Sequence, residues 1–373
     1  MPTQIKKNML AIAFQLCCIS IFCQVQVNFT SWFTDETMRV DLNHFGISTE
    51  EHFSFASIRK EGIWAGSRNN LFDTLNLGDY FIVINDIKTN RQLFSSGFSS
   101  EFEGNENWNV FSDCVRFPFP RKPVQISIGK RNKNNIGFHE IWNDVIDPSS
   151  SNINCFPVTT NTSSKIIFES GDPSIKVDIV ILGDGYNDSE KEAFFHDAER
   201  ASDFLFSVSP YKESKSFFNV RSVFAASEQS GITSPLDKIW KNTAFGSSYN
   251  NDNIERRIGL NNNSRVHDVA ATVPYDFIII LTNSKRYGGE GIYHTYSTVA
   301  INSAWAKYLV VHEFEHNFAT MQLGYFTTLK QQCMKDRYLE NDYAEIWFED
   351  GIVHIVYKSG CILTINNIKP IVQ

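Results

Sequence analysis

The chain has 373 residues, of which 42% are hydrophobic and 20% charged, and its formal net charge is −8. This length favours two domains over one, and the composition excludes a disordered or fibrous chain. Phosphate binding needs clustered Lys and Arg, and no such cluster is visible, so we expect no nucleic-acid partner.

The first residues predict an export signal over residues 1–23. A basic start precedes an apolar run from Met9 to Phe22, which is too short for a comfortable membrane span. A buried first strand or helix is the structural alternative. Lipid attachment at Cys23 is not favoured, because the residues before it are bulky. We therefore expect a secreted or cell-surface/periplasmic protein without a membrane span.

Residues 24–148 are predicted to form an antiparallel β-sandwich that acts as an accessory domain. Short β-rich runs alternate there with Asn, Gly and Asp turn residues, a pattern typical of sandwich strands. The clearest runs are 80–84, 115–117 and 124–128. A Ser- and Asn-rich stretch then predicts a linker over 149–165.

Residues 166–373 change character, because apolar strands alternate there with helical patterns. Between the first two strands we expect a long helix capped by Asn187 or Asp188, since apolar residues recur at helical spacing. The strand candidates are 177–182, 217–226 and 275–281. The expected fold class is therefore α+β, with a sandwich followed by an α/β layer arrangement.

A further helix, predicted from Ala304 to about Met321, carries the segment that points to chemistry. Its sequence contains His-Glu-x-x-His, with His312 and His316 four residues apart. This spacing places both imidazoles on one helical face, where they can converge on one Zn²⁺. Glu313 lies beside that face and can accept the proton of a water that the metal activates.

The structural alternative is a surface helix whose histidines and glutamates make ordinary solvent contacts. It is disfavoured, because Val310, Val311 and Phe314 are expected to bury the same helix. The histidines are therefore expected to face a cleft.

Several unusual stretches point to one family. They are 61–67, 73–78 and 115–120 in the first half, and 177–186, 287–293 and 311–319 in the second. Through them the chain resembles the IgA-peptidase-type zinc metallopeptidases of Bacteroidetes (metallopeptidase family sixty-four), including their N-terminal accessory domain. The resemblance implies a zincin-like domain, a protein or glycoprotein substrate, zinc held by His312 and His316, and Glu313 as general base.

The resemblance breaks after Ala319. In the family an acidic residue shortly after the second histidine completes the metal site, whereas this chain has Leu323 and Gly324 at the aligned positions. Catalytic zinc sites normally use three protein ligands, so we expect an impaired site and a tail altered by frameshift or truncation. Four later acids are alternative ligands, although each is individually expected to be solvated: Asp336, Glu340, Asp342 and Glu345.

Two functions therefore remain open. The first is a secreted zinc endopeptidase, impaired by the missing ligand. The alternative is a catalytically inactive relative that binds protein or glycan at the cell surface. Residues 183–186 are expected either to shape the active site or to form a strand-end turn. His294 and Tyr296, near a presumed edge strand at 297–301, are expected to be cleft-wall or packing residues rather than ligands. No oligomeric state follows from the sequence.

Overall fold

The computed structural model describes residues 27–47, 49–102, 108–133, 137–156 and 161–319, and the backbone of three strands beyond residue 342. The export signal predicted over 1–23 lies outside the described residues. Within the part of the chain that is described, no helix has the length and apolar character needed to cross a membrane.

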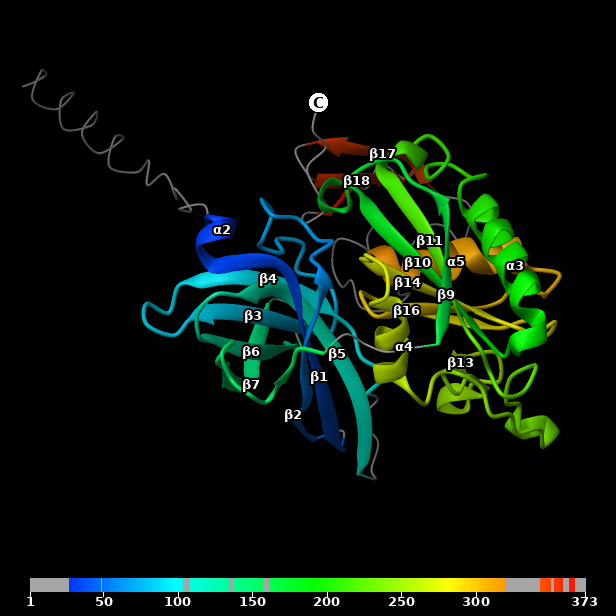
Figure 1. The fold of residues 1–373 in the computed structure, drawn as a ribbon, viewed down its shortest axis with the longest axis horizontal. Coiled ribbons are helices and arrows are strands. Elements are labelled where there is room, and N and C mark those ends of the chain that lie inside the picture. Colours follow the sequence, from blue (N-terminus) through cyan, green and yellow to red (C-terminus); the bar gives the residue numbers. More distant parts are fainter. Residues whose placement is uncertain are drawn as a thin grey trace, which may run out of the picture.

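The first half folds into two four-stranded sheets, which confirms the predicted sandwich (Figure 1). One sheet has the order β5-β1-β2-β8 and the other β4-β3-β6-β7. Paired strands are antiparallel except β2 and β8. A short helix, α2 (Phe29–Trp32), precedes β1 (Phe33–Ile47), β2 (Glu50–Ile63), β3 (Tyr80–Asp86), β4 (Gln92–Phe98), β5 (Asn109–Pro120), β6 (Val124–Arg131), β7 (Phe138–Ile146) and β8 (Ile153–Asn154).

Alternation of side chains builds the core of the sandwich. Along β3 every second residue is buried, because successive side chains of a strand point to opposite faces. Ile82 and Ile84 thus join Val40 of β1 and Ile126 of β6 in one apolar cluster. The strand predicted at 115–117 is longer than expected, since β5 continues through two prolines; β5 is an edge strand, where proline is tolerated.

The linker predicted over 149–165 contains two paired strands. Ile153 of β8 is buried and pairs with Ile58 of β2. β9 (Thr162–Phe168) pairs with a strand of the second half. The connection between β8 and β9 is therefore shorter than the predicted linker, because each of these two strands forms the edge of a sheet.

The second half is built on a six-stranded sheet of order β15-β16-β14-β10-β11-β9. The four inner strands are parallel, and the two edge strands are antiparallel to their neighbours. The strands are β10 (Val177–Asp184), β11 (Phe218–Ala225), β14 (Phe277–Thr282), β15 (Gly289–Ile292) and β16 (Tyr296–Ala300), besides β9. The expectation of an edge strand at 297–301 was wrong, because β15 pairs with β16 and covers it.

Helices cover both faces of this sheet, as the burial of every residue of β10 requires. Ile179 and Ile181 pack with α3 (Lys191–Leu205) and α5 (Ala306–Ala319), whereas Val180 and Leu182 pack with α4 (Asn263–Ala270). The smaller elements are β12 (Ser248–Tyr249), β13 (Ile258–Gly259) and a separate sheet of β17 (Tyr343–Glu349), β18 (Ile352–Tyr357) and β19 (Ile362–Ile365). The α+β class with an α/β second half is confirmed.

Two arginines of the sandwich, the buried Arg39 and the partly buried Arg116, contact the second half directly. Arg39 of β1 donates hydrogen bonds to Asp268 (2.8 Å) and to the carbonyl of Ser264 (3.1 Å), both on α4. Arg116 of β5 donates to the carbonyl of Tyr275 (3.0 Å), and its guanidinium lies 3.6 Å from the centre of the Tyr275 ring. The two halves are therefore joined by buried charged groups as well as by the chain.

Candidate metal centre

Helix α5 positions the His-Glu-x-x-His segment. The backbone N–H of Trp305 bonds the Ser303 hydroxyl (3.2 Å) just before the helix begins. The predicted core residues Leu309, Val310, Phe314 and Phe318 are all buried against α3 and the sheet. Their burial fixes the rotation of the helix about its axis, so the face that bears the histidines turns toward β15.

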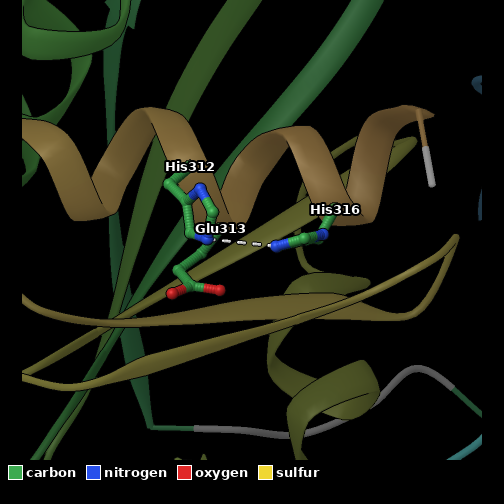
Figure 2. A group of neighbouring side chains, drawn as sticks. All are labelled: His312, Glu313 and His316. Carbon is green, nitrogen blue, oxygen red and sulfur yellow. Dashed lines mark hydrogen bonds between the residues drawn. The ribbon is translucent and has the colours of Figure 1, made fainter. Parts of the chain in front are cut away.

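The two histidines converge as the spacing predicted. Their Nε2 atoms lie 3.1 Å apart and their rings are nearly perpendicular, at 84° (Figure 2). Two nitrogen ligands of one tetrahedral zinc ion, each about 2.0–2.1 Å from the metal, would lie about 3.3 Å apart. The separation of the two nitrogen atoms therefore suits the ligation of a single zinc ion.

Neighbouring groups favour the metal-binding form of His312. Its ring stacks on Tyr308, whose hydroxyl oxygen lies 3.4 Å from Nδ1. A partner on the second ring nitrogen orients a ligating imidazole. Burial, and after it the positive charge of Arg256, lower the pKa of His312. The imidazole is therefore held neutral, as metal binding requires.

Glu313 lies beside the two imidazoles in a buried environment. Ligand atoms of His312, Glu313 and His316 all lie within 4.8 Å of one another, and the three side chains project from one side of α5 (Figure 2). Burial raises the pKa of Glu313 to about 8; Glu290 adds to the rise, and nearby arginines oppose it. A carboxyl group with such a pKa holds its proton near neutral pH, so it becomes a proton acceptor once a neighbouring positive charge lowers that pKa.

Two glycines of β15 let the edge strand approach α5 closely. A Cβ on Gly289 would lie 2.9 Å from Cγ of Glu313, and one on Gly291 would lie 2.2 Å from the Glu313 carbonyl oxygen and 2.5 Å from Cβ of His316. Because residues two apart share one face of a strand, both glycines face the helix. The sequence did not predict that Gly289 and Gly291 allow this close approach, or that Glu290 between them raises the pKa of Glu313. The pattern that could have indicated the close approach is glycine at two alternate strand positions.

Gly291→Ala is expected to destabilise the protein by about 1–3 kcal/mol, the usual cost of an overpacked site. The added methyl group meets backbone, which cannot rotate away, so β15 must move off α5. Thermal unfolding measures the effect. Gly62→Ala is the matched control, since a Cβ there would contact nothing within 4 Å. Equal melting temperatures for the two variants would show that β15 does not press on the helix.

The other candidate residues lie apart from the histidine pair. Asp184, in the 183–186 turn, is fully buried and accepts hydrogen bonds from the backbone N–H groups of Phe245 and Ser247, each 3.0 Å long. Asp184, at the end of β10, therefore fixes the conformation of the loop that contains Phe245 and Ser247. His294 and Tyr296 do not join the metal-binding group among the described residues; both contact the sandwich instead.

The third zinc ligand is not found among the described residues. In that part of the chain, the group able to hold a metal consists of His312, Glu313 and His316. Leu323, Gly324 and three of the four alternative acids lie outside the described residues: Asp336, Glu340 and Asp342. Glu345 lies in β17, a strand of which the structure describes only the backbone.

A cavity of about 160 Å³ lies where the two halves meet, away from the histidine pair. Gly97 of β4, Arg116 of β5, Tyr275 and His294 are among its lining residues, and His312, Glu313 and His316 are not. The cavity therefore belongs to the junction of the two halves rather than to the metal centre.

A mixed sheet whose antiparallel edge strand faces a helix with His-Glu-x-x-His defines a zincin-like peptidase domain. Comparison with known families agrees with this class. The chain belongs to the IgA peptidase M64 family: the model of that peptidase matches residues 166–341, and the model of the peptidase M64 N-terminus matches residues 28–143. No curated protein matches the chain. The family consists of metallopeptidases, so membership implies a protein substrate.

Proposed function

We propose that this chain is an exported zinc-dependent endopeptidase, impaired by loss of the family's third zinc ligand, in which His312 and His316 hold the metal and Glu313 is the general base. The 3.1 Å separation of the two Nε2 atoms carries the proposal, since this distance suits two ligands of one ion. The buried Glu313 carboxylate lies within 4.8 Å of both histidines' ligand atoms. When bound, zinc supplies a Lewis acid that makes a water molecule acidic at neutral pH. With zinc bound, Glu313 would be the residue that accepts a proton from water and donates it to the leaving amine.

Removal of both histidines is expected to reduce the zinc content of the purified protein to background, because two imidazoles supply its nitrogen ligands. The measurement is atomic emission on the wild type and on the double variant His312→Ala, His316→Ala. Cleavage of casein or a mucin-type glycoprotein, with and without a chelator, is followed in parallel.

A matched control removes two exposed histidines, His139 and His196, in the same way. It corrects for zinc bound loosely at the surface. Unchanged zinc content in the His312/His316 variant, or robust cleavage that a chelator does not affect, would refute the zinc site.

One observation favours a second candidate, a catalytically inactive relative that binds protein or glycan at the cell surface. The sequence has Leu323 and Gly324 at the positions aligned with the family's acidic ligand, whereas catalytic zinc normally has three protein ligands and a water. Wild-type protein without zinc and without cleavage, but with affinity for a glycoprotein, would support this candidate.

Export is proposed from the basic start and apolar run over 1–23. Determination of the mature N-terminus after expression in a bacterial host tests it, and removal of residues up to about Cys23 is expected. An intact N-terminus on protein retained in the cytoplasm would contradict export.

A further inference from the structure

The turn between β15 and β16 is bonded to two distant parts of the chain. Tyr293, His294 and Thr295 form this turn, in which the N–H of Thr295 bonds the carbonyl of Ile292 (3.0 Å). His294 has a φ of 54°, in the left-handed region that histidine adopts more readily than most residues. The turn therefore holds a defined conformation at the end of the edge strand.

One set of bonds ties this turn to the sandwich. Nδ1 of His294 donates to the carbonyl of Gly97 in β4 (3.0 Å). Ser99 makes two further bonds to the turn. Its N–H donates to the carbonyl of Tyr293 (3.0 Å), and its carbonyl accepts from the Thr295 hydroxyl (2.9 Å). The end of β4 is thus attached to all three residues of the turn.

The His294 ring is suited to donate at Nδ1. Burial lowers its pKa, and Asp73 and the bond to Gly97 only partly oppose this effect. The ring is therefore neutral and carries one proton, which the carbonyl acceptor places on Nδ1. Stacking on Tyr293, with 4.1 Å between ring centres, and edge contact with Phe277 fix the plane of the ring.

A second bond ties the turn to the helix of the metal centre. The backbone N–H of His294 donates to the carbonyl of Asn317 (3.0 Å), the residue that follows His316 on α5. The Asn317 side chain is fully buried and donates to the carbonyl of Ile278 in β14 (3.1 Å). His294 thus lies directly between the sandwich and the last turn of α5.

We propose that His294 is a positioning residue through which the N-terminal sandwich fixes both the edge strand β15 and the end of helix α5 that carries His316. The role in zinc binding rests on the proposed function, whereas the mechanical link does not. Without the Nδ1 bond, the turn keeps its bond to α5 and its two bonds to Ser99 but loses the attachment of its central residue to Gly97, so β15 and the end of α5 become freer to move.

Three substitutions separate the contributions of His294. His294→Gly permits the left-handed backbone but removes the ring and its hydrogen bond. His294→Asn also permits this backbone, and its side-chain amide places a donor near the position of Nδ1. Asn76→Gly is the matched control, because it removes an exposed side chain at another positive φ (59°) far along the chain.

Hydrogen exchange of the metal-free protein is the deciding measurement, since it requires neither zinc nor activity. Peptides that cover β15 and the second half of α5 are expected to exchange faster in His294→Gly, and at the wild-type rate in His294→Asn and Asn76→Gly. Unchanged exchange in those peptides would overturn the proposal, even if the melting temperature of His294→Gly falls.

Zinc affinity then tests the link to the metal. The dissociation constant of zinc is expected to rise by about tenfold in His294→Gly, at the lower end of what the loss of an outer-shell partner causes, and to recover in His294→Asn. Altered exchange with unaltered zinc affinity would overturn the link to the metal site. Wild-type protein that binds no zinc would instead refute the proposed function, while the exchange result still decides whether His294 positions α5.

Discussion

Glu313→Gln is expected to lower the rate of peptide hydrolysis by about 10²–10⁴-fold at saturating zinc, because an amide cannot accept the proton of the attacking water. The side chain is nearly isosteric, so the two histidines and the packing of α5 should be unaffected. The expected signature is therefore a loss of kcat with zinc content equal to that of the wild type. Chelator-sensitive cleavage of casein at fixed zinc concentration measures it.

The control for this variant is Glu199→Gln, which neutralises an exposed helical carboxylate on α3. Its rate should equal the wild-type rate, which excludes a general effect of net charge. Wild-type rates in Glu313→Gln, with intact chelator sensitivity, would assign the proton transfer to another group. A loss of zinc in that variant would indicate that Glu313 acts as a ligand instead.

Local patterns were sufficient to predict the parts of the fold that depend on neighbouring residues. The β-rich run at 80–84 identified β3, and the four-residue spacing of His312 and His316 identified their common helical face. Both signals are intrinsic to one element, because side-chain direction follows from strand or helix geometry. The predicted helix core around Phe314 was confirmed for the same reason.

Features that depend on pairing between distant segments were not predictable in this way. The sequence at 297–301 is compatible with either an inner or an edge strand. The strand is an inner one because it pairs with β15, which the local sequence does not show. The importance of Gly291 emerges only when β15 lies against α5. Likewise, Arg39 and Asp268 form a partly buried ion pair across 229 residues of sequence, which no local pattern encodes.

That ion pair belongs to a buried network centred on Arg39, whose side chain is 1% exposed. Its guanidinium donates to Asp41 (2.7 and 2.9 Å), to Glu61 (3.0 Å) and to Asp268 (2.8 Å). Burial alone would raise the pKa of Asp41, but the hydrogen bond and charge of Arg39 outweigh it and lower that pKa below its ordinary value of 3.8. Arg39 thus keeps the buried Asp41 carboxylate ionised and also pairs with a carboxylate of the second half, Asp268.

Arg39→Met is therefore expected to destabilise the protein by about 3–5 kcal/mol at pH 7, because it leaves buried carboxylates without their counter-charge. The stability that the lowered pKa of Asp41 gives the wild type is fully present above pH 3.8 and is lost as the pH falls through the lower folded-state pKa. The difference in the free energy of unfolding between the wild type and the variant should therefore become smaller on acidification. Calorimetric unfolding at several pH values measures it. Lys88→Met, in an exposed turn, controls for the loss of a cation; equal melting temperatures for both variants at pH 7 would show that this network does not hold the two halves together.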